Sequence, residues 1–344
     1  MSEMTQTARW AELELTYNGK NISESIADSL LDFTYNDAAS GSLDDIDLRL
    51  EDRKLKWQNA WAAQEGDVIK ATIRTHHWNK PGESQKLAFG EFEVDSGSVG
   101  GPPDTVSIKA TSLPVKAGVR FEKRTKAWEK TKLKTIAAEV AAKAKLKLLY
   151  EATDNPSYDR IDQTEMSDLA FLLDTATKEG IAIKVASGRL VLFDEFEYEK
   201  KPPVATIVRG RDPVLDFSFN WSIASKAYRS SVLTYTDTSS KKTYKAAFTP
   251  PGAPVSGPVL KLNEQVTSQA EAQRLARMRL REKNKEYGTG SLTLMGDVRM
   301  ATGLTITLKG WGRYDGKYLI ESCSHTLGSG GYTTALQIRK VLGW

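Results

Sequence analysis

Histidine and cysteine, which supply most metal ligands and many nucleophiles in proteins, are rare in this sequence. There are three histidines, His76, His77 and His325, and a single cysteine, Cys323. His76 and His77 are adjacent in an alternating run, so their side chains are expected on opposite faces of a strand and not on one metal ion. No spacing among these residues matches a zinc motif. We therefore predict no metal site, no disulfide within the chain and a plain buried thiol at Cys323.

Other motifs that carry chemistry are also missing. The sequence has no Gly-x-Ser-x-Gly turn for a serine nucleophile and no Gly-x-x-x-x-Gly-Lys loop for a phosphate. Its 44 acidic residues are too many for one pair to be assigned to glycoside cleavage. We predict no catalytic residue, no cofactor and no cofactor-binding residue, and we leave the residues of the partner interface unassigned.

Charge is distributed in blocks, although the net charge of the chain is only +4. Glu24–Asp52 has nine acidic residues against one arginine, Arg120–Lys147 has ten basic against three acidic, and Gln269–Lys285 has six basic against two acidic. Opposite blocks can meet across subunit joints, which predicts an assembly that added salt weakens. Solvated faces of separate elements are the alternative interpretation. Arg120–Lys147 includes only Phe121 and Trp128 as aromatic residues, fewer stacking rings than single-strand nucleic-acid binders use.

The size and composition are those of an ordinary globular protein. With 344 residues, of which 40% are hydrophobic and 27% charged, the chain can form two or three domains. No apolar run approaches the roughly 18 residues that a transmembrane helix needs. The N-terminal sequence lacks the basic-then-apolar pattern of a secretory signal, which predicts a protein that is made and kept in the cytoplasm.

The N-terminal third has the pattern of short β-strands. Apolar and polar residues alternate in five runs, which are residues 11–16, 46–50, 68–73, 89–94 and 105–110. Many short strands at regular spacing favour a barrel or a sandwich. Trp57 and Trp61 follow the second run and are expected to cap the open end of its core.

The middle of the chain mixes helix and strand signals. Thr131 can cap an amphipathic helix over residues 133–144. A second helix, capped by Ser167 or Thr164, has one apolar stripe, formed by Leu169, Leu172, Leu173 and Ala176. The pattern then changes to alternation around a tight turn at residues 187–188, which predicts a hairpin.

A linker at residues 200–203, which contains two prolines, precedes the last third. Residues 215–221 and 231–235 alternate and are predicted as strands. We expect residues 236–258 to form a long surface loop, within which residues 244–248 are able to pair as a strand.

The C-terminal part begins with a helix signal. Ser268 and Glu271 form a capping box that opens a helix over about residues 268–286. Four strand-like runs follow, at residues 290–295, 304–308, 318–326 and 332–341.

An ordered series of short motifs resembles one protein family over nearly the whole chain. In the first third these motifs are Leu48–Arg53, Trp57, Trp61, Gly66-Asp67, Phe89–Asp95 and Gly101–Pro103. In the middle they are Gln163, Ser167–Leu172 and Glu179-Gly180. The series resembles the phage late control protein D family, which comprises baseplate hub proteins of contractile phage tails. The family is related to the hub part of type VI secretion spike proteins.

The resemblance implies a β-rich α+β fold, with two tail-tube-like β-barrel domains flanking a small α+β domain. The implied boundaries are residues 1–116 for the first barrel, 117–201 for the middle domain and 202–344 for the second barrel with an outer helix. The second barrel is implied to be a diverged relative of the first.

The implied function is structural and not enzymatic. The family forms trimers in which six similar barrels make a pseudo-sixfold ring between the hexameric tail tube and the trimeric central spike. The expected partners are two further copies of the chain, the tube protein, the spike protein and other baseplate or wedge proteins. DNA is expected to pass through the channel without specific binding, and no membrane insertion is expected. The expected location is the tail baseplate of the virion, after assembly in the host cytoplasm.

Two functions from other classes stay open at this point. The first is a baseplate-associated enzyme that degrades cell wall or glycan, although the three hub regions leave no spare domain for it. The second is a soluble scaffold that binds nucleic acid, which retention of the protein on DNA at physiological salt would favour.

Overall fold

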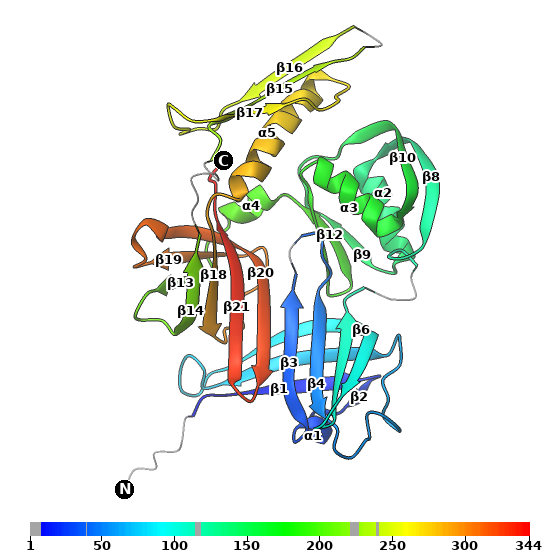
Figure 1. Cartoon of the computed structure of the whole chain (residues 1–344), viewed down its shortest axis with the longest axis vertical. Helices are drawn as coiled ribbons and strands as arrows, with labels where there is room; N and C mark the ends of the chain where they lie inside the picture. Colours follow the sequence, from blue (N-terminus) through cyan, green and yellow to red (C-terminus); the bar gives the residue numbers. More distant parts are fainter. Residues whose placement is uncertain (1–7, 39, 114–117, 221–226, 239–240) are drawn as a thin grey trace.

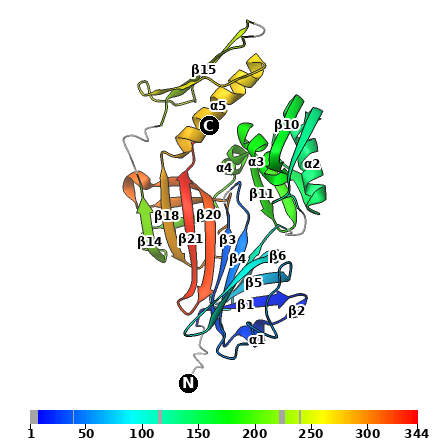
Figure 2. The ribbon, with the colours of Figure 1, turned by 45° about the vertical axis from the view of Figure 1, so that its right-hand side comes forward.

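The computed structural model of the protein describes residues 8–38, 40–113, 118–220, 227–238 and 241–344. Over these residues the chain is rich in β-structure, with one sheet of 13 strands, three smaller sheets and few helices. Two β modules lie side by side and share the large sheet (Figure 1). In both views the middle of the chain lies above the first module, and a long helix with a small sheet lies above the second module (Figure 2).

The first β module is built from the N-terminal third of the chain. Its sheet order is β3-β4-β7-β6-β5-β1, and β2 pairs with the end of β1. In chain order its elements are β1 (Trp10–Tyr17), β2 (Lys20–Asn21), α1 (Ser23–Ile26), β3 (Leu30–Asp37), β4 (Asp45–Glu51), β5 (Val68–His76), β6 (Ser84–Gly100) and β7 (Thr105–Thr111).

Alternation of side chains explains most of these strands. In β4, for example, Ile46, Leu48 and Leu50 are buried in the core and the residues between them are more exposed. The five runs predicted from alternation lie within β1, β4, β5, β6 and β7, so those predictions are confirmed. Alternation did not predict β3. Of the two tryptophans, only Trp57 is buried in this core, and the exposed Trp61 packs edge-on against it.

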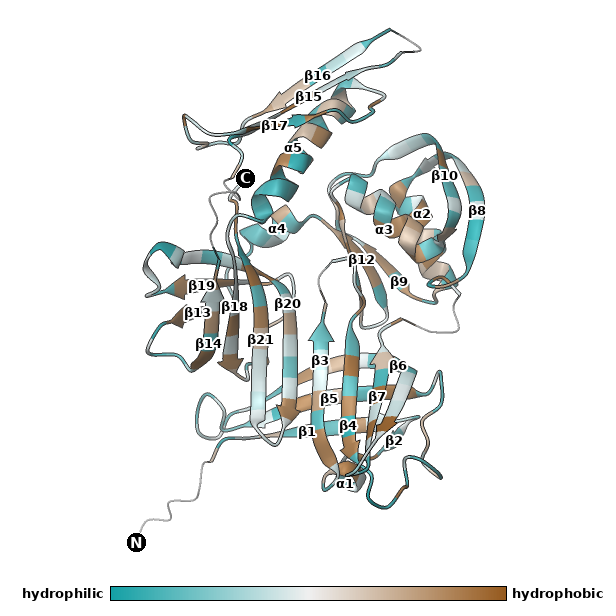
Figure 3. Ribbon diagram, in the orientation of Figure 1, coloured by the Kyte–Doolittle hydropathy of each residue, from teal (hydrophilic) through white to brown (hydrophobic). Residues whose placement is uncertain are grey.

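The middle region combines two longer helices and one short helix with two small sheets. Its core lies between the helices and the three-stranded sheet β11-β12-β9, while the ladder of β8 and β10 is largely hydrophilic (Figure 3). The elements are β8 (Lys123–Lys132), α2 (Leu133–Lys143), β9 (Lys147–Tyr150), β10 (Ser157–Ser167), α3 (Asp168–Lys178), β11 (Ala182–Ala186), β12 (Arg189–Phe193) and α4 (Glu195–Lys200).

Local signals in the middle region were partly correct. The Ser167 hydroxyl accepts a hydrogen bond from the Ala170 amide at 3.4 Å and caps α3, as one of the two predicted caps. Ser187 and Gly188 have φ angles of 49° and 71° in the two-residue turn between β11 and β12, which confirms the hairpin. Thr131 as a helix cap was wrong. Its pairing with Tyr158 of β10 keeps Thr131 extended, and the Lys134 amide in the first turn of α2 donates instead to the Asn155 side chain at 3.0 Å.

The buried face of α3 also differs from the predicted stripe. Leu172 and Ala176 are buried as expected, whereas Leu169 and Leu173 are only partly buried. Phe171, at the intervening position, is buried instead, because its ring stacks on that of Trp128 with centroids 6.3 Å apart.

The second β module uses the C-terminal part of the chain. Its sheet order is β14-β18-β21-β20-β19-β13. Its elements are β13 (Ala205–Val208), β14 (Val214–Phe219), β18 (Thr289–Met295), β19 (Thr305–Lys309), the short 3-10 helix η2 (Gly312–Tyr314), β20 (Gly316–Gly328) and β21 (Gly331–Lys340).

A helix and a small sheet are inserted between β14 and β18. They are β15 (Ser230–Thr236), β16 (Thr243–Phe248), β17 (Val259–Leu262) and α5 (Gln269–Lys285). Helix α5 packs on one face of this sheet and has a small core of its own, which includes Leu233 and Ala276. The surface-loop prediction for residues 236–258 was therefore wrong where β16 pairs with β15, and the strand alternative for residues 244–248 is confirmed.

The start of α5 uses the predicted residues with one change. Ser268 accepts a hydrogen bond from the Glu271 amide at 3.1 Å, as a cap does. The Glu271 carboxylate, however, accepts from the Thr267 amide at 2.7 Å. The reciprocal half of the capping box is thus displaced by one residue toward the N-terminus.

The two β modules have one strand order. The order β3-β4-β7-β6-β5-β1 corresponds, position by position, to β14-β18-β21-β20-β19-β13, and the strands follow the same succession along the chain. Four of the five neighbouring pairs are antiparallel in both modules. The fifth pair differs, because β1 is antiparallel to β5 whereas β13 is parallel to β19. The modules are two versions of one topology in which one peripheral strand is reversed.

The corresponding strands β3 and β14 also share an irregularity and a sequence. Each has a register shift at the same point of its ladder, beside Leu31 in β3 and Leu215 in β14. Alignment at this shift sets Leu30–Asn36, with the sequence LLDFTYN, against Val214–Asn220, with the sequence VLDFSFN. This repeat is the signal in the sequence that could have predicted β3, because alternation predicted β14 but not its counterpart.

Candidate assembly surfaces

An internal junction joins the two modules edge to edge. The C-terminal half of β20, Cys323–Gly328, pairs antiparallel with β3, whereas its N-terminal half pairs with β19. Side chains reinforce the ladder across the junction. The hydroxyls of Thr34 and Thr326 lie 3.2 Å apart, and the Ser324 hydroxyl donates to the Asn36 side chain. The junction is therefore an ordinary sheet continuation with matched polar pairs on one face.

On the other face of the junction, His325 lies in an aromatic cluster. Its ring stacks between those of Tyr35 and Tyr332, with centroids 6.1 and 5.9 Å away. Its Nε2 lies 3.0 Å from the Met300 carbonyl and its Nδ1 lies 2.7 Å from the Tyr332 hydroxyl. A neutral ring that donates from Nε2 and accepts at Nδ1 satisfies both contacts, and burial accordingly lowers the pKa of His325.

Cys323 and His325 approach each other but do not form a nucleophile and base. The Cys323 sulfur lies 3.2 Å from His325 Nε2. That nitrogen carries the proton that it donates to Met300, so it has no lone pair to accept a proton from the thiol. Burial raises the pKa of Cys323 well above its usual value, and the prediction of a buried thiol is confirmed.

Asp37 connects the three regions of the chain. Its carboxylate pairs with Lys184 of β11 and accepts a hydrogen bond from the Thr302 amide of the second module at 2.7 Å. Asp44 lies 3.4 Å from the same lysine and accepts from the Tyr35 hydroxyl at 3.1 Å. Both carboxylates are buried, and burial raises the pKa of Asp44 to about 6.

A second buried charge network joins helix α4 to the second module. Arg339 of β21 is almost fully buried and reaches Glu199 at 2.6 Å, Glu195 at 2.8 Å and Glu321 at 3.1 Å. Arg281 of α5 pairs with Glu199 at 2.5 Å. Strands β20 and β21 and helices α4 and α5 are thus held together by charges that lie mostly away from water.

The charged blocks of the sequence are paired to a large extent within the chain. In the acidic block, Asp32 pairs with Arg49 at 3.0 Å. In the basic block after residue 120, Lys126 pairs with Glu139 at 2.7 Å. On α5, Arg274 reaches the middle region through Glu179 at 2.6 Å. Of these three pairs, the first two lie within one region, and only the Arg274–Glu179 pair joins two regions of the chain.

Besides β2 and β13, two further edges of the large sheet have a ladder partner on one side only among the described residues. β14 pairs only with β18, and the segment Asp95–Gly100 of β6 pairs only with β7. Both edges carry exposed apolar side chains, namely Leu215 and Phe217 on β14 and Val99 on β6. Unpaired edges of this kind are templates for pairing with another strand.

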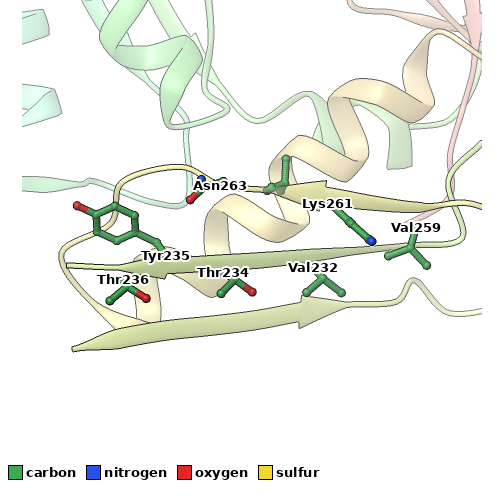
Figure 4. A pocket seen from close by; sticks show the side chains of 8 residues that line it. Val232, Thr234, Tyr235, Thr236, Val259, Lys261 and Asn263 are labelled. Atoms are coloured by element: carbon green, nitrogen blue, oxygen red, sulfur yellow. The ribbon is translucent and has the colours of Figure 1, made fainter. Parts of the chain in front are cut away.

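One hollow of the described surface, of about 980 Å³, is lined by charged side chains of the middle region and α5 that include Glu179, Arg274 and Glu282. A shallow one of about 790 Å³ lies on the face of the small sheet that α5 leaves open (Figure 4). Its lining consists of Val232, Thr234, Tyr235, Thr236, Val259, Lys261, Leu262 and Asn263. Within the described part of the chain, no cluster of three or more potential metal ligands was found, and none of the helices is long and apolar enough to cross a membrane.

Comparisons with known proteins place the chain in a family. Residues 117–331 match the family model described as phage tail baseplate hub (GPD). A probable baseplate hub protein of Escherichia phage 186 is 24% identical over 373 residues, which cover 95% of this chain and 92% of that protein.

Solved structures share the fold. A tail protein from Neisseria meningitidis MC58 has a TM-score of 0.72 at 14% identity, covering 97% of this chain and 98% of that one. The E. coli c3393 protein, a component of the type VI secretion system, has a TM-score of 0.58 at 11% identity, covering 91% of this chain and 74% of that one.

The chain is a phage tail protein of structural type, and it belongs to the phage tail baseplate hub family. The resemblance stated from the sequence motifs is thereby confirmed, and the chain has the structural hub role of the family as a component of the virion tail. The sequence predicts no catalytic or metal-binding residue and leaves the partner interface unassigned. The junction and the two open edges are the surfaces that sequence reasoning missed.

Proposed function

We propose that this chain forms a homotrimeric ring at the centre of the baseplate of a contractile phage tail or a phage-like tail. The ring would join the hexameric tail tube to the trimeric central spike. The observation that carries the proposal is the repeated strand order, joined at β3 and β20 into one sheet. Three chains with two similar modules each offer six similar positions to the tube and three positions of a different kind to the spike.

We further propose that the chain divides at the boundaries that the resemblance implies. Residues 1–116 and 202–344 would be tail-tube-like barrels, and residues 117–201 the α+β domain between them. Three hydrophobic clusters, one centred on each region, support this division, and Leu327 and Tyr332 of the second module extend the first cluster across the junction. The second part also includes the small sheet and α5 as an outer element with a core of its own.

In this proposal the protein acts by assembly and not by catalysis. It would contact tube, spike and other baseplate or wedge proteins, assemble in the host cytoplasm, and let DNA pass without specific binding. The inert contact of Cys323 with His325 supports a structural role, because the thiol and imidazole that lie together cannot exchange a proton. No cofactor is needed for this role.

The test is the mass of the purified protein in solution, alone and with the spike protein encoded beside it. Light scattering should give three chains per particle, or three chains on one spike. A single chain in both samples would contradict the proposal. Turnover of peptidoglycan or surface polysaccharide by the same preparation would instead support an enzyme, and retention on DNA at physiological salt would support a nucleic-acid scaffold.

A further inference from the structure

Eight strands of the large sheet form one continuous row. The row is β14-β18-β21-β20-β3-β4-β7-β6, and its neighbours are antiparallel throughout. Its two ends are the edges described above, β14 at one end and Asp95–Gly100 of β6 at the other. Because the number of strands is even, β14 and β6 run in opposite directions along the row. Copies placed head to tail would therefore meet in antiparallel pairing.

The internal junction shows what such an edge meets in this fold. Strand β3 corresponds to β14, and β20, which covers β3, corresponds to β6. A second register shift, beside Asp95 in β6 and Glu321 in β20, aligns these two strands. It sets Ser98 against Ser324 and Val99 against His325. Gly97–Gly100, within the uncovered segment of β6, is thus the counterpart of Cys323–Thr326, within the half of β20 that covers β3.

Exposure of matched residues shows that the end surfaces lack a neighbour. Phe33 of β3 is 0% exposed, whereas its counterpart Phe217 is 39% exposed. His325 of β20 is 0% exposed, whereas its counterpart Val99 is 57% exposed. Leu215, at the shift in β14, is 60% exposed. Apolar groups that are buried at the filled junction are left in water where the same edge is open.

We propose that Ser218–Asn220, at the end of β14, pairs with Ser98–Gly100 of β6 in the next copy, in the register that β3 and β20 use inside each chain. The inference rests on the proposed ring and names the surfaces that close it. In the internal register, Asn36 lies opposite Ser324 and Tyr35 lies opposite His325. When this register is applied to the ends of the row, using the alignments of β3 with β14 and of β20 with β6, Asn220 lies opposite Ser98 of the next copy and Phe219 lies opposite Val99. The Asn220–Ser98 pair repeats the residue types of the Asn36–Ser324 hydrogen bond.

This pairing would turn the row into a closed sheet. Each copy contributes the same eight strands, and every strand of the row gains a partner on both sides. The contact is head to tail, so it closes into a ring when the rotation between copies returns to the start. A backbone ladder with apolar side chains on one face is the means by which sheet edges recognise strands.

The pairing can be tested with disulfides. The full-length variant with both Asn220→Cys and Ser98→Cys should cross-link between copies under mild oxidation, giving ladders up to the trimer on a non-reducing gel. Asn36→Cys with Ser324→Cys is the matched reference and should cross-link within one chain. Asn220→Cys with Ser96→Cys shifts the pair by two residues and should cross-link about tenfold less, because the diagonal separation of about 7–8 Å exceeds disulfide reach.

The outcomes separate the inference from the proposed function. If the wild-type particle is trimeric and the reference pair links, but the Asn220–Ser98 pair does not exceed the shifted pair, the proposed edge pairing is wrong and the ring stands. If the wild type is a single chain both alone and with the spike protein, the ring itself is wrong.

A charge on the open edge gives a second test. Val99→Lys should reduce the trimeric fraction by at least about tenfold, because a buried apolar contact would have to accept an ammonium group. The far-ultraviolet circular dichroism of the single chain should stay unchanged. Val255→Lys is the matched control, since Val255 is also exposed but lies in the loop between β16 and β17. An unchanged trimer in Val99→Lys would contradict the proposal.

Discussion

Strands β3 and β14 have nearly the same sequence and the same register shift, but they lie in different surroundings. β3 is covered by β20, so Phe33 is buried and the polar residues beside it find partners across the junction. β14 is the end of the sheet, and its matched Phe217 is partly exposed beside the ring of Trp311. One strand pattern thus serves a permanent contact at one place and an open edge at another. The local sequence shapes the edge, and the rest of the fold decides whether it is covered.

The largest expected effect separates the two phenylalanines. In the single chain, Phe33→Ala should lower the free energy of unfolding by about 3–5 kcal/mol, because it leaves a cavity in a closed core. Phe217→Ala should cost only about 1 kcal/mol, because part of its ring is already in water. Urea unfolding followed by tryptophan fluorescence would measure both. Equal costs would show that the two edges are equally covered and would break the comparison.

A second difference between the modules is the buried arginine of the second one. Arg339 corresponds to Thr111 of the first module, according to the matched pairings of β21 and β7. Arg339→Thr should cost about 3 kcal/mol, since it removes a buried cation from three carboxylates. Arg53→Thr, at an exposed ion pair, should cost less than about 1 kcal/mol. Thermal unfolding of both variants would check this, and similar costs would contradict a specific role for the buried network.

The acidic pair that docks the middle region is a feature of the first module, and it predicts a pH effect. When β4 is aligned with β18, the position of Asp44 is occupied by Gly288 in the second module. Its folded pKa of about 6 lies above the usual unfolded value of about 3.9, so the folded state binds a proton more readily. Stability from this group is therefore present at low pH and is lost as the pH rises through about 6.

Asp44→Asn should remove that dependence. As the pH rises from 4 to 7, the free energy of unfolding of the variant should increase by about 2 kcal/mol relative to that of the wild type, because the variant side chain cannot ionise. Urea unfolding of both proteins at several pH values measures the difference. Tyr35→Phe, which removes one hydrogen bond to Asp44 and keeps its carboxyl, is the control. Parallel pH curves for the wild type and Asp44→Asn would contradict the assigned ionisation.

The smallest expected effect concerns the hydroxyls on the two edges. Thr34→Val should cost about 1 kcal/mol, because the Thr326 hydroxyl loses its partner across the filled junction. Ser218→Ala, at the matched place on the open edge, should change the stability of the single chain by less than about 0.5 kcal/mol. A cost for Ser218→Ala as large as that of Thr34→Val would show that β14 already has a partner.

The success of sequence reasoning differed between local and distant features. Alternation predicted β1, β4, β5, β6 and β7, because each strand buries one face, and that period is visible in single residues. The cap at Ser167 and the turn at residues 187–188 were also local. The Thr131 cap failed because a ladder with β10, 27 residues further along the chain, holds that residue extended. The repeat of LLDFTYN and VLDFSFN was available in the sequence, but periodicity compares a residue with its neighbours and not with a segment elsewhere.

The amino-acid sequence by itself determined where most strands and helices form and which family it resembles. Those properties depend on side-chain period, capping groups and residue types, all of which act over a few positions. Only the tertiary structure decided that β20 covers β3, that Arg274 of α5 pairs with Glu179 of the middle region, and that β14 and part of β6 are left open. Backbone hydrogen bonds between strands are alike for every sequence, so the choice of partner depends on the packing of whole modules.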